Sequence, residues 1–267
     1  MSGFTKSVAY PWALTGIFGA FHLVLTFIPF SVLGMGGGFL TWGMVSAAIV
    51  GFFIGPFYGT IAVLIGSLIG TGIFNLGGIL GPIVPILAPT AGAFAAGALR
   101  LGRVRELAIV YLIAIIAYVV GPIGISGFVF IWLHLIAFVI IVILLVPKIY
   151  NKLKESITFE KGRDLKLMPV AVFLFSFLAL MTDHIVGNAA TIYYFYYFGA
   201  TDAATLLTWW LPITFVYPVE RLLATLILGI IVIAAGEAIV QTGFELPTTP
   251  WEKRETLELS SEEIEES

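Results

Sequence analysis

Charged and polar side chains that could do chemistry interrupt two apolar stretches in the C-terminal half of the chain. They are Asp183, His184 and Asn188 in the stretch TDHIVGN, and Glu220 and Arg221 in the stretch PVERLLA. An Asp or Arg at the centre of a membrane helix costs about 2.5–3.5 kcal/mol, so these side chains are candidates for function. Neighbours in sequence point apart on a helix, so Glu220 does not simply pair with Arg221. The predicted partner of Arg221 is Asp183.

The composition indicates that these side chains lie within a membrane. The 267 residues are 60% hydrophobic and only 11% charged, and the mean hydropathy is +1.06. Soluble domains average about 45–50% apolar and about 25% charged residues. The sequence contains no Cys, which excludes disulfides, thiolate metal sites and Cys nucleophiles. We therefore expect an all-α, polytopic helical membrane protein, with no metal or other cofactor.

Apolar stretches of nearly spanning length recur along the chain, separated by Gly and Pro. The expected segments are 8–30, 39–54, 56–75, 79–99, 106–123, 127–147, 167–187 and 206–236. The second segment is short enough to be re-entrant, so the expected number of transmembrane helices is about six to eight. They form a transmembrane domain over residues 1–243, and residues 244–267 form an acidic cytoplasmic tail.

Lys and Arg residues predict the orientation of these segments. With eight spans, twelve of the thirteen basic residues fall on one side of the membrane, and Arg221 is the exception. Basic loops stay in the cytoplasm, so both termini are expected there and the protein is expected in the cell membrane.

With this topology, eight polar residues share the outer half of the membrane. They are His22, Asn75, His134, Asp183, His184, Asn188, Glu220 and Arg221. Between the last two segments lies a row of aromatic residues: Tyr193, Tyr194, Tyr196, Tyr197, Trp209, Trp210 and Tyr217. This convergence predicts a substrate pocket open to the outside, capped by aromatics that include Trp209 and Tyr217. The alternatives are packed polar residues and an interfacial aromatic belt.

Four stretches resemble a known family. GPFYGTIAVLIGSLIG, APTAGAFAAGALRLGR, TDHIVGN and PVERLLA are similar to parts of the substrate-binding S components of energy-coupling factor transporters, in particular archaeal ones. The resemblance implies a membrane receptor that captures a small vitamin-like solute from outside for ATP-driven uptake. It also implies a complex with a coupling membrane subunit and two ATPases, and a docking role for Gly16 and Ala20. Their four-residue spacing is typical of closely packed membrane helices.

Three other functions stay open. The stretch GISG matches the nucleophile motif of rhomboid proteases, with Ser126 as nucleophile and His184 as its base. An ion- or proton-coupled carrier or channel would use Asp183, His184 and Glu220 as a relay. A structural membrane subunit is the third alternative. We expect no enzymatic activity and no nucleic-acid partner, and because no GxxxxGK[ST] loop is present, ATP hydrolysis would belong to partners.

Overall fold

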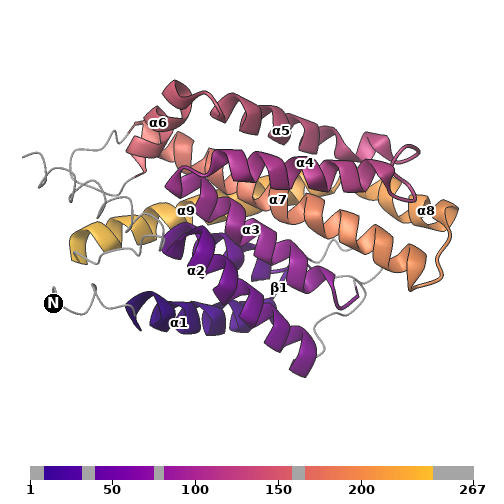
Figure 1. The fold of residues 1–267 in the computed structure, drawn as a ribbon, viewed down its shortest axis with the longest axis horizontal. Helices are drawn as coiled ribbons and strands as arrows, with labels where there is room; N and C mark the ends of the chain where they lie inside the picture. Colours follow the sequence, from indigo (N-terminus) through magenta and orange to yellow (C-terminus); the bar gives the residue numbers. More distant parts are fainter. Residues whose placement is uncertain (1–8, 32–39, 75–80, 158–165, 243–267) are drawn as a thin grey trace, which may run out of the picture.

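The computed structural model describes residues 9–31, 40–74, 81–157 and 166–242. These residues form mostly helices, joined by short connections (Figure 1). The elements are α1 (Ala9–Thr26), β1 (Pro29–Ser31), β2 (Leu40–Thr41), α2 (Gly43–Phe74), α3 (Val84–Leu101), α4 (Val104–Val120), η2 (Phe128–Ile131), α5 (Trp132–Leu144), α6 (Pro147–Ser156), α7 (Leu167–Tyr197), α8 (Ala203–Ile213) and α9 (Tyr217–Thr242). The strands β1 and β2 pair antiparallel.

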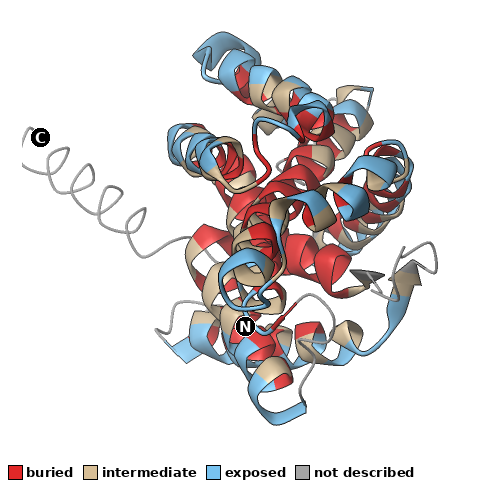
Figure 2. Cartoon of the chain, turned by 90° about the vertical axis from the view of Figure 1, so that its right-hand side faces the viewer, coloured by how far each residue is buried: buried red, intermediate tan, exposed pale blue. Residues whose placement is uncertain are grey.

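Five helices are long and apolar enough to cross a membrane: α1, α2, α3, α7 and α9. A sixth crossing is possible if α5, with its preceding turn η2, counts together with α6, although that pair is bent by 96°. Large apolar side chains also face outward, including Ile17 at 64% exposure, Ile113 at 60% and Ile230 at 61%. Figure 2 shows the corresponding pattern, with buried residues inside and exposed residues on the outer helix faces. The chain is therefore a multi-pass helical membrane protein.

Helix α2 is a hairpin of two helices that meet at Gly55. Gly55 has φ 85° and ψ 173°, a conformation that is essentially restricted to Gly. Ser46 and Ser67 would lie about 31 Å apart on a continuous helix, yet both hydroxyls contact the ring of His22. The residues 43–54 and 56–74 therefore run antiparallel, and they correspond to two of the predicted segments.

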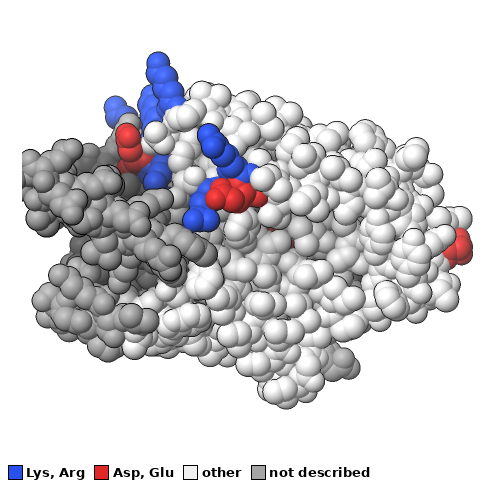
Figure 3. All heavy atoms as spheres, viewed as in Figure 1, with Lys and Arg blue, Asp and Glu red and all other residues white. Residues whose placement is uncertain are grey.

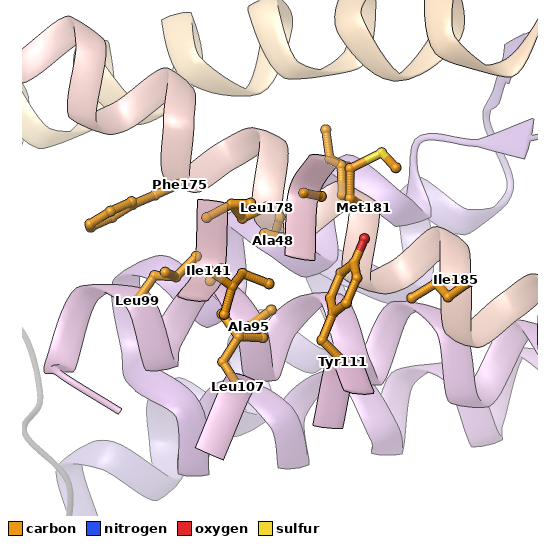
Figure 4. Packing of buried hydrophobic residues seen from close by; sticks show 14 of the residues in the cluster. Ala48, Ala95, Leu99, Leu107, Tyr111, Ile141, Phe175, Leu178, Met181 and Ile185 are labelled. Atoms are coloured by element: carbon orange, nitrogen blue, oxygen red, sulfur yellow. The ribbon is translucent and has the colours of Figure 1, made fainter. Parts of the chain in front are cut away.

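Helix α7 occupies the centre of the fold and packs against α3, α4, α5, α6 and α9. Its 31 residues make it about 46 Å long. Figure 4 shows Leu99 of α3, Leu107 of α4, Ile141 of α5 and Leu178 of α7 pointing into one apolar cluster. The polar residues of α7 lie on the same buried helix, so apolar packing holds them in place.

Two predicted segments have different bounds in the structure. The predicted segment 167–187 continues as helix to Tyr197, so the Tyr row belongs to α7 and not to a loop. Tyr193 supports this extension by donating a hydrogen bond to the Ala117 carbonyl at 3.0 Å. The predicted segment 206–236 divides into α8 and α9, and the second helix begins at Tyr217, next to Pro218, where a Pro is tolerated.

Asp202 lies outside the apolar segments and is the N-cap of α8. The Asp202 Oδ1 accepts a hydrogen bond from the Thr205 backbone N–H at 2.9 Å. This bond, together with one from the Thr205 hydroxyl, holds the pKa of the Asp202 carboxyl below its usual range. The cap satisfies one of the free N–H groups that every helix start carries.

Apart from the buried Arg221, the basic residues of the described chain gather at one end of the bundle. Arg100 and Arg103 lie where α3 meets α4, and the Lys residues of α6 lie nearby, since Lys154 Nζ approaches Gly102. Figure 3 shows Lys and Arg at the left end of the visible face and only an acidic group at the right end. The two ends of the bundle therefore differ in charge.

Candidate functional site

Asp183 of α7 and Arg221 of α9 form a buried ion pair. Arg221 Nη1 lies 3.4 Å from Asp183 Oδ2, and the exposed fractions of the two residues are 6% for Asp183 and 1% for Arg221. Gly92 of α3 provides the space beside the acid, because a Cβ built there would lie 3.0 Å from Asp183 Cβ. The contact predicted from the sequence is thus confirmed.

This ion pair leaves hydrogen-bonding capacity unused. Arg221 Nε is buried without a hydrogen-bond partner, and Nη1 makes its short contact, 3.0 Å, with the thioether of Met44. The 3.4 Å distance to Asp183 is long beside the usual 2.7–2.9 Å of a charge-assisted bond. The site therefore has a buried donor, Arg221 Nε, that could serve a polar molecule.

A chain of hydrogen bonds lies beside the ion pair. Tyr111 Oη contacts His134 Nδ1 at 3.0 Å, and His134 Nε2 contacts His184 Nδ1 at 3.1 Å. A neutral imidazole donates from one nitrogen and accepts at the other. The direction in which hydrogen bonds are donated along this chain therefore fixes the tautomer of both His rings. The three groups come from α4, α5 and α7, and they tie these helices together.

Aromatic rings enclose the two His rings. The Tyr217 ring lies 5.7 Å from that of His134 at an interplanar angle of 10°, and 4.7 Å from that of His184. Tyr217 donates from its hydroxyl to the Phe130 carbonyl at 2.8 Å. The prediction placed Tyr217 in a cap, but it is fully buried inside the cluster. Its position at the start of α9 turns its ring inward.

Asn188 joins the cluster through a different Trp from the one predicted. Asn188 donates to the His184 carbonyl at 2.7 Å and accepts from Trp210 Nε1 at 3.0 Å. Trp209 is 42% exposed and packs edge-on against Phe195. Trp209 therefore lies outside the buried cluster, because the inward face of α8 carries Leu206 and Trp210, four residues apart. That helical spacing is the signal that could have identified Trp210.

His22 does not join this cluster. It is fully buried, and it contacts Ser46 Oγ through Nδ1 at 2.8 Å and Ser67 Oγ through Nε2 at 3.0 Å. The reason is that α1 packs on the α2 hairpin, away from α7. His22 was predicted to line the pocket. Instead it bridges the two halves of the α2 hairpin and acts as a clamp between them.

The other predicted residues have mixed positions. Glu220 is 8% exposed and lies in the first turn of α9, as expected. Asn75 lies outside the described residues. Gly16 and Ala20 lie on the exposed face of α1, and a Cβ built at Gly16 meets nothing within 4 Å. Their docking role remains a prediction.

The Ser126–His184 pair expected for a protease is not formed in this structure. Ser126 is exposed in the turn before η2, whereas His184 is 9% exposed and uses Nδ1 to contact His134. The described part of the chain also contains no group of three His, Cys, Asp or Glu side chains suited to a metal ion.

The polar cluster is closed in this structure, unlike the open pocket predicted. The two best-formed cavities in the described part of the chain lie elsewhere. One, of about 460 Å³, is an apolar groove between α3, α4 and α7, lined by residues such as Leu87, Ala114 and Tyr193. The other, of about 240 Å³, lies near Pro56 and Arg103. Neither cavity is lined by the ion pair or the His residues.

The fold and this cluster define a multi-pass helical membrane protein with a buried polar site. No family model matches the chain, and no solved structure matches it. The chain is similar to an uncharacterised protein of Methanocaldococcus jannaschii, with 26% identity over 215 residues. The match covers 80% of this chain but only 66% of that protein.

Proposed function

We propose that this protein is a solute-binding subunit of a transporter in the cell membrane, similar to the S component of an energy-coupling factor transporter. It captures a small vitamin-like solute from outside, and partner subunits supply the ATP hydrolysis for uptake. The observation that carries the proposal is the buried ion pair of Asp183 and Arg221, in which Arg221 Nε has no partner. Such groups are costly in a membrane unless something else binds them.

The charge distribution supports access from outside. Basic residues at the ends of α3 and α6 mark the cytoplasmic end of the bundle. Arg221 lies in the first turns of α9, at the opposite end. Both termini are then cytoplasmic, and the cluster lies in the outer half of the membrane, where an external solute reaches it.

The exposed face of α1 is the proposed contact with a coupling membrane subunit. Gly16 and Ala20 are exposed there, whereas Gly19 packs inside, since its Cβ would lie 3.0 Å from the Ala62 carbonyl. The Gly16→Leu variant should fold normally and lose its membrane partner, because a side chain at this position meets nothing in the protein itself.

The test is purification from native membranes in mild detergent, followed by mass spectrometry of co-purifying proteins and small molecules. We expect a bound solute and a second membrane subunit with ATPases. The Asp183→Asn/Arg221→Met variant should lose the solute and keep the partners, while Gly72→Ala, which meets no neighbouring atom within 4 Å, should keep both. Recovery of the folded wild type with neither solute nor ATPases would contradict the proposal.

A proton-coupled carrier is the second candidate, and the chain from Tyr111 through His134 to His184 favours it. Such a chain can pass a proton if its ends open to water in turn. Proteoliposomes that contain a pH-sensitive dye distinguish the two functions. A carrier should acidify the lumen down a solute gradient without ATPases, and His134→Phe should abolish this flux.

A further inference from the structure

The first half of α2, residues 43–54, begins inside the protein. Gly43, Met44 and Val45 are all buried, and Val45 is 0% exposed. A helix start normally finds water or a capping side chain for its free N–H groups. Here the start lies against the outer half of α9, because Met44 contacts Arg221.

Two N–H groups at this helix start have no hydrogen-bond acceptor within the described chain. The Gly43 N–H donates to Thr41 Oγ1 at 3.1 Å, and the Ser46 N–H donates to the Trp42 carbonyl at 2.9 Å. Met44 and Val45 lie between these two residues in the sequence, and their backbone N–H groups have no acceptor among the described residues. An unsatisfied buried N–H costs about as much as a lost hydrogen bond.

Arg221 brings a positive charge to the same place. Its Nη1 lies 3.0 Å from Met44 Sδ, although a thioether is a weak acceptor. Its Nε, in a side chain only 1% exposed, has no partner. Met44 is unbranched and flexible, so it can fill this space when the site is empty and leave when a ligand enters.

We propose that the start of the 43–54 helix and Arg221 together bind an anionic oxygen group, a carboxylate or a phosphate, on the captured solute. This inference rests on the proposed function and names the chemical class of the solute. The start of a helix carries about half a positive charge, and its N–H groups point at an anion. A guanidinium fork binds two oxygens of such a group at once.

Asp183 balances the charge of Arg221 without blocking this site. Its Oδ2 contacts only Nη1 of the guanidinium, at 3.4 Å. Of the five donors of an Arg side chain, the Nε–H is buried without a partner and remains for a second acceptor. Glu220, the residue before Arg221 in the first turn of α9, brings a second negative charge that also acts on the guanidinium. The unsatisfied donors around Met44 therefore favour an anion over a cation.

The test uses simple ions as probes on protein purified in a neutral detergent at constant ionic strength. Sodium acetate, sodium phosphate and, as a cation control, methylammonium chloride are titrated while the thermal unfolding midpoint is followed. Acetate or phosphate should raise the midpoint of the wild type, because a ligand that binds only the folded state stabilises it. Methylammonium should not.

Three variants locate the anion. Met44→Pro removes one of the free N–H groups in a turn that tolerates Pro. The preceding residue is Gly43, which lacks the Cβ that clashes with a following Pro ring. Met44→Leu keeps that N–H and removes only the sulfur. Arg221→Lys keeps the charge and removes the fork. We expect Met44→Leu to bind the anion as the wild type does, and the other two to bind it about tenfold more weakly, the factor of one charge-assisted hydrogen bond.

Equal anion binding by the wild type, Met44→Pro and Arg221→Lys would overturn the inference, and so would stabilisation by methylammonium alone. The experiments distinguish the failure of the anion site from the failure of the proposed function. A neutral or cationic solute that co-purifies would keep the function and overturn the anion site. Anion binding lost in Met44→Pro, with no transport partners found, would keep the site and contradict the function.

Discussion

Arg221 is a buried charged side chain, so neighbouring groups must compensate its charge. It is 1% exposed, and it forms an ion pair with a carboxylate oxygen of Asp183. Removing one partner of a buried pair leaves a charge without compensation, which costs about 3–5 kcal/mol, whereas replacing both costs far less. The pair therefore holds α7 and α9 in one arrangement.

We expect Asp183→Asn to lower the free energy of unfolding by about 3–5 kcal/mol, because Arg221 then keeps its charge without a carboxylate. Asp183→Asn/Arg221→Met should recover most of that loss. Denaturation by an ionic detergent, followed by circular dichroism, measures both. If the single variant were as stable as the wild type, the ion pair would contribute nothing to the fold.

His22 makes two hydrogen bonds that span the α2 hairpin, one to each half. His22→Leu should lower the stability by about 1–3 kcal/mol, since it removes both bonds and leaves the Ser67 hydroxyl unpaired. In a Ser46→Ala/Ser67→Ala background the same change should cost less. The difference between the two costs, measured in one double-mutant cycle, is the energy of the clamp. Equal costs in both backgrounds would show that the clamp contributes no coupling.

At the level of elements, the α2 hairpin depends on glycines that let backbones touch. A Cβ at Gly51 would lie 1.9 Å from the Ala93 carbonyl oxygen, and one at Gly97 would lie 2.3 Å from the Pro56 nitrogen. Both halves of α2 therefore pack directly on α3. Because backbone atoms form these contacts, no side chain can move aside to accept a larger residue.

Gly51→Ala should destabilise the protein by about 1–3 kcal/mol or more, because the backbones of α2 and α3 must separate. Gly72→Ala, on the same element, meets nothing within 4 Å and should be neutral or slightly stabilising, as Ala favours helix over Gly. Thermal unfolding of the two variants in detergent compares them. A stable, fully folded Gly51→Ala protein would mean that the hairpin does not pack on α3 in this way.

The whole molecule has a basic end and an end without basic groups on its visible face, and this asymmetry predicts its orientation. The wild type has no Cys, so a single introduced Cys reports its own side of the membrane. Lys152 of α6 and Ser126 in the turn before η2 are both exposed. They lie at opposite ends of α5.

A membrane-impermeant thiol reagent on intact cells should label Ser126→Cys and leave Lys152→Cys unlabelled. Inverted vesicles should give the opposite result, because the proposed topology places the basic end in the cytoplasm. Labelling after solubilisation controls for the reactivity of each thiol. Labelling of Lys152→Cys in intact cells would reverse the orientation and place the polar cluster toward the cytoplasm.

The linear sequence determined the class of protein and most of its helices. Apolar runs interrupted by Gly and Pro predicted α1, α3, α4 and α7, because each run must bury its backbone polar groups as helix in a membrane. The Asp183–Arg221 contact was also predictable, since a buried Arg needs an acid at the same depth and the sequence offers few.

Only the tertiary structure decided which polar residues meet. Nothing near His22 in the sequence shows that it faces Ser46 and Ser67, because that depends on the reversal at Gly55. The choice of Trp210 over Trp209 depends on the rotation of α8 about its axis. The contact of Met44 with Arg221 joins residues from opposite ends of the chain. Helix formation is local, whereas the neighbours of a helix and the face it turns toward them follow from packing the whole bundle.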